Sequence, residues 1–295
     1  MSKIFVLAGP TASGKTDYAL QFAQRNHCEI LSCDAVSFYK NLDIGSAKPT
    51  KLEQSIVKHW GIDLVEANQY FCIQDYVTYA KNCVDDIFKR GYNVLVVGGS
   101  GFYLKSFFEP VVDNFEASLV LQERLKDLES SQGIAGVFDA LLNLNLQGFP
   151  KNFDIKNPQK LRKALLHCWT SGLDLLTLEE RFKKQPKPFS GITKESTLLV
   201  WPLELLFVRA KKRIERMLRN GLIEEVEALL PVFQENHPAT NAIGYRETIQ
   251  YLKNKNRGTI TELAETIFHN TCHLIKKQNT WFRHQIKWQH YFWMH

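Results

Sequence analysis

The stretch that most constrains this chain lies at its start, where a glycine-bounded turn joins a short apolar run to a helical pattern. Ile4 to Ala8 is apolar throughout and predicts a buried strand, and apolar residues at helical spacing follow Thr16. The turn between them reads Gly-x-x-x-x-Gly-Lys-Thr, which is the pattern of a phosphate-binding loop between a strand and a helix. The start of the chain therefore predicts an α/β fold with an anion site at the end of its first strand.

Each residue type in this loop has a physical reason to be there. Gly9 and Gly14 allow backbone N–H groups to turn inward around phosphate oxygens, and the helix N-terminus adds partial positive charge. Lys15 supplies a full charge, and the Thr16 hydroxyl is placed to hold Mg²⁺. The loop is typical of nucleotide-binding and ATP-binding proteins, and it does not by itself identify the diphosphate that it holds. The residues expected to bind the diphosphate are Gly9, Pro10, Thr11, Ala12, Ser13, Gly14, Lys15 and Thr16.

The rest of the chain predicts a parallel sheet with helices on both faces. Mainly apolar runs at Glu29–Cys33 and Tyr92–Val97 alternate with a helical pattern at Gln74–Arg90. From about residue 113 the pattern becomes helical, with a clear helix at Pro158–Ser171, and Leu198–Leu206 returns to an apolar, strand-like run. We therefore expect a P-loop core carrying a mainly helical insertion. The expected segments are 1–112 for the first part of the core, 113–194 for the insertion, and 195–295 for the second part of the core with basic and aromatic C-terminal helices.

The composition of the chain indicates the cellular compartment and the kind of binding partner to expect. No apolar run is long enough to span a membrane, the first strand follows the start of the chain directly, and the six cysteines show no C-x-x-C spacing. We therefore expect a cytoplasmic protein with reduced thiols and no membrane partner. The net charge of +6 is mild, but Lys276, Lys277 and Arg283 lie among aromatic residues near the C-terminus. This mixture suits a nucleic-acid surface, or a helix that packs its aromatics on the core and solvates its charges.

Three further segments carry chemistry. Asp34 follows the second predicted strand, where a carboxylate can act as a general base or a metal ligand, or cap a helix. Gly98-Gly99 and Ser100 follow the Tyr92–Val97 strand, either as a ligand contact or as a tight turn, and no Asp ends that strand. The missing carboxylate argues against an NTP hydrolase. Arg209, Arg213 and Arg216 share one helix face, which suits a leaving diphosphate or a solvated basic surface.

These segments also match a known family in order. The matching stretches are Gly9 to Thr16, Asp34 to Tyr39, Asp43 to Thr50, Val97 to Lys105, Pro158 to Leu165, Arg213-Ile214 with Met217-Leu218, Ala242 to Glu247, and Lys277 to Arg283. Together they resemble the tRNA dimethylallyltransferases over nearly the whole chain. The resemblance implies transfer of a dimethylallyl group from dimethylallyl diphosphate to N6 of the adenosine 3′ of the anticodon in tRNAs that read codons starting with U.

The resemblance also implies roles for individual residues. Asp34 matches the catalytic Asp and is expected to be the general base, with Ser100 near the leaving oxygen and Arg213 stabilising the diphosphate. The metal expected is Mg²⁺ on Thr16, and the partner is the tRNA anticodon stem-loop, bound by a monomer with the adenine flipped into a channel. The residues expected to contact tRNA are Asp34, Ala35, Val36, Ser37, Ser100, Gln159, Lys160, Leu161, Arg162, Lys163, Lys277 and Arg283.

Two departures from the family pattern keep alternatives open. Ser37 stands where the family usually has a Gln that reads the adenine edge, and Cys272 stands where an Arg is usual. A hydroxyl cannot make the bidentate contact of an amide. The alternatives are prenyl transfer to free adenine nucleotides, a non-catalytic tRNA-binding relative, and a small-molecule kinase that uses ATP at the loop.

Overall fold

The computed structural model describes residues 2–111, 115–234, 237–254 and 258–294. The chain divides into two compact units, one formed by Met1–Glu109 with Pro188–His295 and the other by Pro110–Lys187. The insertion was expected at 113–194, whereas the second unit is Pro110–Lys187. Residues from Pro188 onward belong to the core unit, and Lys194 begins a strand of its sheet.

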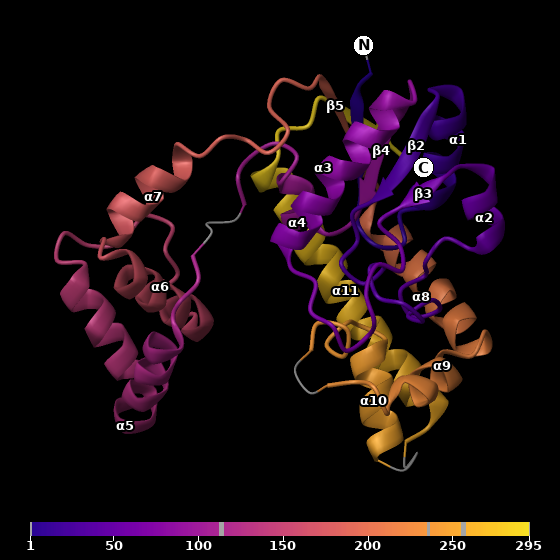
Figure 1. Cartoon of the computed structure of the whole chain (residues 1–295). Coiled ribbons are helices and arrows are strands. Elements are labelled where there is room, and N and C mark those ends of the chain that lie inside the picture. Colours follow the sequence, from indigo (N-terminus) through magenta and orange to yellow (C-terminus); the bar gives the residue numbers. More distant parts are fainter. Residues whose placement is uncertain (1, 112–114, 235–236, 255–257, 295) are drawn as a thin grey trace. The chain divides into compact units, whose positions relative to one another are not determined.

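The core unit is built on one parallel sheet, shown in Figure 1. Within the described residues this sheet has six strands, in the order β3-β2-β4-β1-β5-β6. All the paired strands run parallel, so the α/β prediction is confirmed. The strands are β1 Ile4–Ala8, β2 Cys28–Ser32, β3 His59–Trp60, β4 Asn93–Gly98, β5 Lys194–Val200 and β6 His290–Trp293.

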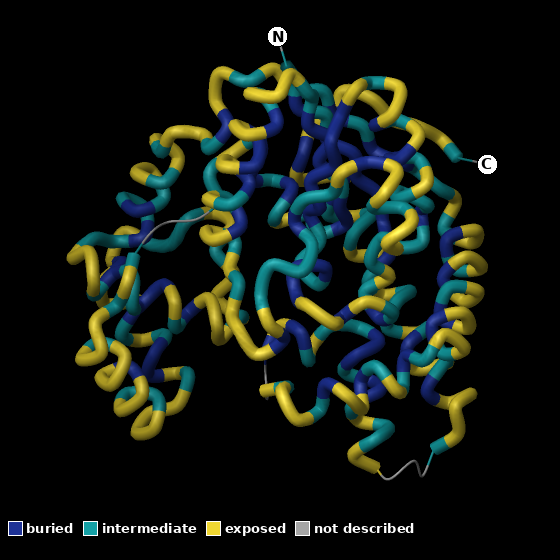
Figure 2. Tube along the Cα trace, turned by 45° about the vertical axis from the view of Figure 1, so that its right-hand side comes forward, coloured by how far each residue is buried: buried dark blue, intermediate teal, exposed yellow. Residues whose placement is uncertain are grey.

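Neighbouring residues of a strand point to opposite sides of the sheet. Because the residues on both sides are apolar, helices cover both faces. Val94 and Val96 of β4 pack in the cluster that holds the apolar face of α3, whereas Leu95 packs in the cluster of α1. Figure 2 shows the resulting buried centre of the unit. The helices of this unit are α1 Lys15–Arg25, α2 Lys51–Ile56, α3 Ile73–Lys89, α4 Gly101–Lys105, α8 Leu203–Arg219, α9 Leu222–Leu229, α10 Tyr245–Lys253 and α11 Ile260–Gln285.

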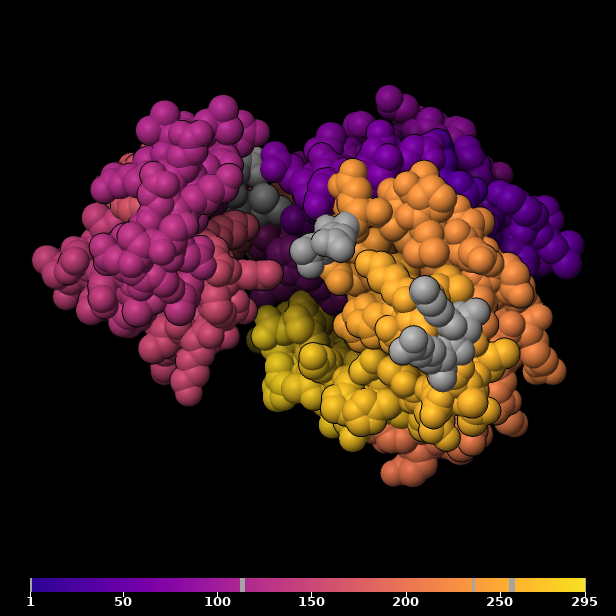
Figure 3. All heavy atoms as spheres, turned by 90° about the horizontal axis from the view of Figure 1, so that it is seen from below, coloured from indigo at the N-terminus to yellow at the C-terminus, as the bar shows by residue number. Residues whose placement is uncertain are grey.

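The C-terminal helices form a second layer below the carboxyl ends of the strands. Helices α8, α10 and α11 pack on one another around Ile214, Met217, Tyr245 and Ile267. The same cluster includes Tyr39 and Leu42 from the loop after β2. Seen from below in Figure 3, these orange and yellow segments lie side by side and adjoin the indigo N-terminal residues of the same unit. The C-terminal helices thus provide one wall of the space in front of the phosphate loop.

The second unit has its own apolar core. It contains α5 Leu119–Leu144, α6 Pro158–Ser171 and α7 Leu175–Lys183. Helix α6 begins and ends as its sequence predicts: Asn157 caps the N–H groups of Gln159 and Lys160, and Gly172 takes the left-handed conformation after the last turn. The helices that the sequence predicts at Leu119–Ser130 and Ala135–Leu142 form α5, which is interrupted at Gly133 with φ 65°.

Candidate active site

The phosphate loop joins β1 to α1 as the sequence predicts. Gly14 has φ 79° and Ala12 has φ 64°, the left-handed region that bends the loop around its centre. The Lys15 ammonium donates hydrogen bonds of 2.8 Å to the carbonyl oxygens of Gly9 and Pro10. Burial lowers the pKa of Lys15 to about 8, and the nearby Asp34 carboxylate partly opposes this shift. Lys15 is therefore mainly protonated at neutral pH.

Asp34 and Ser100 lie side by side because β2 and β4 are parallel neighbours that end at the same edge of the sheet. The Ala35 N–H donates to the Ser100 hydroxyl over 3.1 Å, and the Val36 N–H donates to the Asp34 carboxylate over 3.1 Å. Gly98 permits this close approach, since a Cβ there would lie 2.1 Å from the Cys33 carbonyl oxygen. The two predicted catalytic residues are thus held on adjoining strand ends.

Helix α8 brings its arginines to the phosphate loop. Arg213 donates to the Thr11 hydroxyl over 3.1 Å and to the Ser46 carbonyl over 3.3 Å, and Arg209 donates to the Ala12 carbonyl over 2.7 Å. Burial lowers the pKa of Arg213, which the Asp34 carboxylate partly opposes. Within the described residues no carboxylate forms an ion pair with Arg213. Its charge is oriented by neutral oxygens and remains available to an anion.

Gln278 of α11 connects the phosphate loop to the turn after β4. Its side-chain oxygen accepts from the Thr11 N–H over 2.8 Å, and its amide nitrogen donates to the Gly99 carbonyl over 2.9 Å. Sequence reasoning placed this residue in a family motif without giving it a role. The contact joins positions 267 residues apart, which no local pattern reveals.

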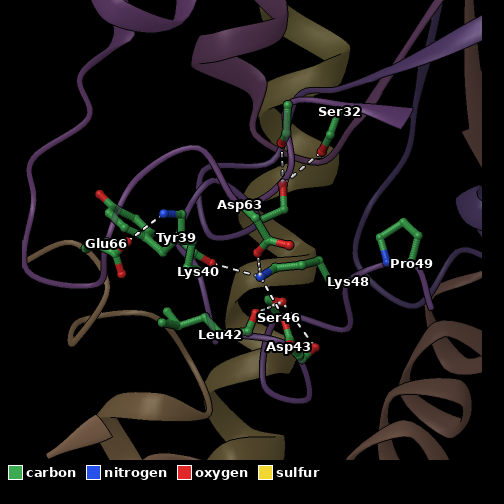
Figure 4. A network of polar contacts seen from close by, with 12 residues as sticks. Ser32, Tyr39, Lys40, Leu42, Asp43, Ser46, Lys48, Pro49, Asp63 and Glu66 are labelled. Atoms are coloured by element: carbon green, nitrogen blue, oxygen red, sulfur yellow. Dashed lines mark hydrogen bonds and ion pairs between the residues drawn. The ribbon is translucent and has the colours of Figure 1, made fainter. Parts of the chain in front are cut away.

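Lys48 organises the loop that follows β2, as Figure 4 shows. Its side chain is 3% exposed, and its ammonium donates to the Tyr39 carbonyl over 2.8 Å, to Asp43 over 2.7 Å and to Asp63 over 2.6 Å. Asp63 itself has φ 56°. The ion pairs tie the segment around Asp43 to the segment around Asp63, and both segments line the space in front of the phosphate loop.

Two cavities meet at these residues. The first, about 670 Å³, is lined by the phosphate loop from Thr11 to Thr16 and by Arg209, Lys212 and Arg216. The second, about 640 Å³, lies towards α10 and α11 and is lined by Ser100, Phe102, Arg246, Lys277 and Trp281. Both cavities share the wall residues Thr11, Asp34, Ser46, Gly99, Arg213, Met217 and Gln278.

The expected tRNA contacts next to Asp34 divide into three kinds. Val36 lines the second cavity, and Ala35 packs against the sheet core. Ser37 is 5% exposed, and its hydroxyl lies 2.8 Å from the Ser32 hydroxyl and donates to the Asp34 carbonyl over 2.9 Å. The Ser37 side chain is therefore mostly buried and hydrogen-bonded within the protein, and its contact with tRNA stays a prediction.

The expected contacts on α6 lie in the second unit. Gln159, Lys160 and Lys163 are exposed, and Arg162 pairs with Glu129 of α5. Leu161 is 4% exposed and packs in the core of the unit, so its side chain does not face a ligand as expected. It belongs to the predicted set because the family resemblance covers the whole motif Pro158 to Leu165.

The C-terminal basic and aromatic residues also divide. Lys277 and Arg283 are exposed on α11, and Lys277 lines the second cavity. Phe282 and Trp288 are buried in the sheet core, while Trp293 of β6 is 63% exposed. The packing of aromatics on the core is thus confirmed for Phe282 and Trp288, while the nucleic-acid surface stays a prediction.

Oxygen donors for a hard cation lie at the entrance of the loop. Thr16 and Asp34 line the first cavity together. Among the described residues no group of three or more His, Cys, Asp or Glu side chains could hold a metal ion alone. This donor set fits Mg²⁺, which proteins bind through one or two oxygen side chains together with phosphate oxygens.

No helix in the described part of the chain has the length and apolar character that crossing a membrane requires. All six cysteines are free thiols in the structure.

Comparison with known proteins gives consistent matches. The family model described as IPP transferase matches residues 37–285. A protein of Opitutus terrae named tRNA dimethylallyltransferase is 40% identical, over 96% of this chain and 91% of its own length. A protein of the same name from Leuconostoc citreum is 34% identical, over 97% of this chain and 92% of its own length.

Solved structures agree. The tRNA isopentenylpyrophosphate transferase of Bacillus halodurans matches with a TM-score of 0.69 and 26% identity, covering 100% of this chain and 90% of that one. A eukaryotic dimethylallyltransferase solved while acting on tRNA has a TM-score of 0.82 at 22% identity, over 96% of this chain and 70% of that one, and so shows the shared fold. The resemblance stated from the motifs is confirmed, and this chain belongs to the IPP transferase family.

Proposed function

We propose that this protein transfers a dimethylallyl group from dimethylallyl diphosphate to N6 of the adenosine 3′ of the anticodon, in tRNAs that read codons starting with U. The observation that carries the proposal is the shared wall of the two cavities. One cavity holds a phosphate loop and arginines, the other holds aromatic and basic side chains, and Asp34 and Arg213 line both. A diphosphate in one cavity and a base in the other would meet at this wall.

On the donor side, the chain's own charges stabilise the leaving group. The allylic C–O bond breaks as the N6–C bond forms, and both electrons of the C–O bond leave with the diphosphate. Lys15 and Arg213 face the space in which this negative charge develops, and such preorganised charges lower the barrier most. Thr16 would hold Mg²⁺, which when bound would neutralise further diphosphate charge.

On the acceptor side, the exocyclic amine must lose a proton as it attacks. The Asp34 carboxylate accepts this proton, because it lies at the junction of the two cavities and is already oriented by the Val36 N–H. Ser100 adds a hydroxyl on the side of the second cavity and fixes the segment after Asp34 through the Ala35 N–H. Each turnover thus moves carbon to nitrogen and leaves the phosphorus–oxygen bonds of the diphosphate intact.

The second cavity supplies the surface for the nucleic acid. Lys277 and Arg246 give positive charge for phosphates, and Phe102 and Trp281 give rings on which bases stack. An adenosine in the single-stranded anticodon loop costs least to extrude into such a cavity. In this proposal the protein works as a monomer in the cytoplasm, and the exposed α6 residues Gln159, Lys160 and Lys163 add contacts from the second unit.

The test is to incubate the protein with Mg²⁺, labelled dimethylallyl diphosphate and an unmodified tRNA that reads UNN codons, with AMP as a competing acceptor. Label in tRNA that persists in excess AMP is the expected result. Label in AMP in preference to tRNA would reverse the assignment of the acceptor. Label in neither, across a range of Mg²⁺ concentrations, would leave a tRNA-binding protein without this activity. Phosphate transfer from ATP would indicate a kinase.

A further inference from the structure

Arg213 is held in place by a loop whose own position depends on α9. The Ser46 carbonyl that accepts from Arg213 belongs to the turn Asp43 to Ser46. The three preceding N–H groups of this turn all donate to one carboxylate, that of Glu225. Oε2 of Glu225 accepts from Asp43 over 3.0 Å and Ile44 over 2.7 Å, and Oε1 accepts from Gly45 over 3.1 Å.

Tyr245 completes this arrangement from α10. Its hydroxyl donates to Glu225 Oε1 over 2.7 Å and accepts from the Ser46 N–H over 3.2 Å. Burial and the charge of Glu225 raise the pKa of Tyr245, so the phenol keeps the proton that it donates. The hydroxyl end of the ring lies directly against Gly45, where an added Cβ would be 2.5 Å from it, so the turn packs closely on Tyr245.

The contacts form one chain from α9 to the phosphate loop. Glu225 fixes the turn, and the turn presents the Ser46 carbonyl to Arg213. That carbonyl and the hydroxyl of Thr11, a residue of the phosphate loop, together orient the Arg213 guanidinium. The Glu225 carboxylate accepts hydrogen bonds from backbone N–H groups and from Tyr245. It therefore anchors the turn without pairing with Arg213 and neutralising its charge. A carboxylate against successive N–H groups is a strong anchor.

We propose that Glu225 and Tyr245 are positioning residues, which set the Asp43–Ser46 turn so that Arg213 faces the leaving diphosphate. The proposal rests on the function proposed above. Glu225 lines neither of the two cavities described, so it does not contact a ligand there itself. The proposal therefore predicts that Glu225 affects the reaction only through Arg213. A residue with a purely structural role would instead affect the protein to the same degree whether or not Arg213 is present.

The test is a double-mutant cycle of Glu225→Gln with Arg213→Gln. A small displacement of an orienting group can cost up to about 100-fold in rate, so we expect Glu225→Gln to lower kcat by roughly 10- to 100-fold with the KM for tRNA unchanged. In the Arg213→Gln background the same change should cost less than about threefold. Glu227→Gln on the exposed side of α9 is the matched control and should keep full activity.

A second readout does not depend on the reaction. Glu225→Gln should weaken the binding of inorganic pyrophosphate about tenfold when Arg213 is present and leave it unchanged when Arg213 is absent. If Glu225→Gln does not fold, Tyr245→Phe takes its place, because it removes only the hydroxyl. Equal losses in both backgrounds would overturn the positioning role. A wild-type protein that transfers nothing to tRNA would instead count against the proposed function, while the pyrophosphate cycle still decides the positioning role.

Discussion

The Arg213 guanidinium donates a hydrogen bond of 3.1 Å to the hydroxyl of Thr11, and so joins α8 to the phosphate loop across 202 positions of the chain. The same side chain has no carboxylate partner among the described residues, although Asp34 lies near enough to raise its pKa against the effect of burial. A permanent charge placed against the loop in this way is suited to an anion that gains charge during the reaction.

Removal of this charge should therefore impair the chemistry more than the binding of nucleic acid. We expect Arg213→Gln to lower kcat by about 100- to 1,000-fold, the range found when one preorganised donor to a developing charge is removed. The tRNA affinity should change little. Single-turnover rates and filter binding measure the two effects. Arg219→Gln, in the exposed last turn of the same helix, is the control. A loss of tRNA affinity equal to the loss of rate would contradict the assignment.

The charge of Lys15 gives a pH dependence. Its pKa is lowered from 10.5 to about 8, so the buried amine loses its proton as the pH rises through 8. Pyrophosphate affinity should then fall about tenfold for each pH unit well above 8, if binding needs the protonated amine. Calorimetric titrations from pH 7 to 10 measure this. In the Lys15→Gln variant the titration of pyrophosphate itself still affects binding, but the fall in affinity that begins near pH 8 should be absent. An identical pH profile in both proteins would contradict the prediction.

The same shift affects the stability of the free protein in the opposite direction. Below pH 8 the folded state must bury a charged amine that prefers water, and this costs stability. Between pH 8 and 10.5 the unfolded chain binds more protons at Lys15 than the folded chain does, so this contribution improves as the pH rises. The difference in unfolding free energy between wild type and Lys15→Gln should change across this window and be constant below it.

Lys48 offers a test of the loop after β2. Lys48→Met keeps most of the side-chain volume but leaves Asp43 and Asp63 without their cation, and we expect a loss of about 2 kcal/mol in the free energy of unfolding. The value is below that of a fully buried pair because both carboxylates are partly exposed. Lys40→Met breaks the neighbouring exposed pair with Glu66 and should cost about 0.5 kcal/mol or less. Urea unfolding measures both, and equal effects would show that burial of Lys48 does not matter.

The second unit should be perturbed without loss of the anion site. Leu165 is fully buried between α5 and α6, so Leu165→Ala should destabilise this unit by about 3 kcal/mol. Hydrogen exchange should accelerate in α5 and α6, while pyrophosphate binding by the core unit is unchanged. Leu146→Ala, at a position 87% exposed, should have little effect on either. Loss of pyrophosphate binding in Leu165→Ala would show that the two units do not keep separate cores.

Elements whose signals are local were predictable from the sequence. The apolar run of β1 and the Pro158 and Gly172 boundaries of α6 gave the observed ends, because burial and capping act within a few residues. The run Leu198–Leu206 is a strand only as far as Val200, where β5 ends; Pro202 then caps α8, which begins at Leu203. Strand β6 was not predicted, because its residues are exposed and it is defined by pairing with β5 across the chain.

The site shows the same division. The sequence singled out the loop, Asp34, Ser100 and Arg213 because their residue types carry recognisable chemistry, and the structure brings them together. Ser46 was not found, because it contributes a backbone carbonyl, and any residue type supplies one. The sequence also could not show that the Ser37 hydroxyl contacts the Ser32 hydroxyl and donates to the Asp34 carbonyl. What sequence patterns miss here are contacts made by backbone atoms and by residues far apart in the chain.

The most direct test of the central claim is nucleoside analysis of an unmodified tRNA for UNN codons after incubation with the protein, dimethylallyl diphosphate and Mg²⁺. The account predicts one N6-dimethylallyladenosine per tRNA, 3′ of the anticodon, with wild type. It predicts none with Asp34→Ala, which should still bind tRNA because it lacks only the proton acceptor. An unmodified tRNA with wild type, or equal modification by both proteins, would contradict the account.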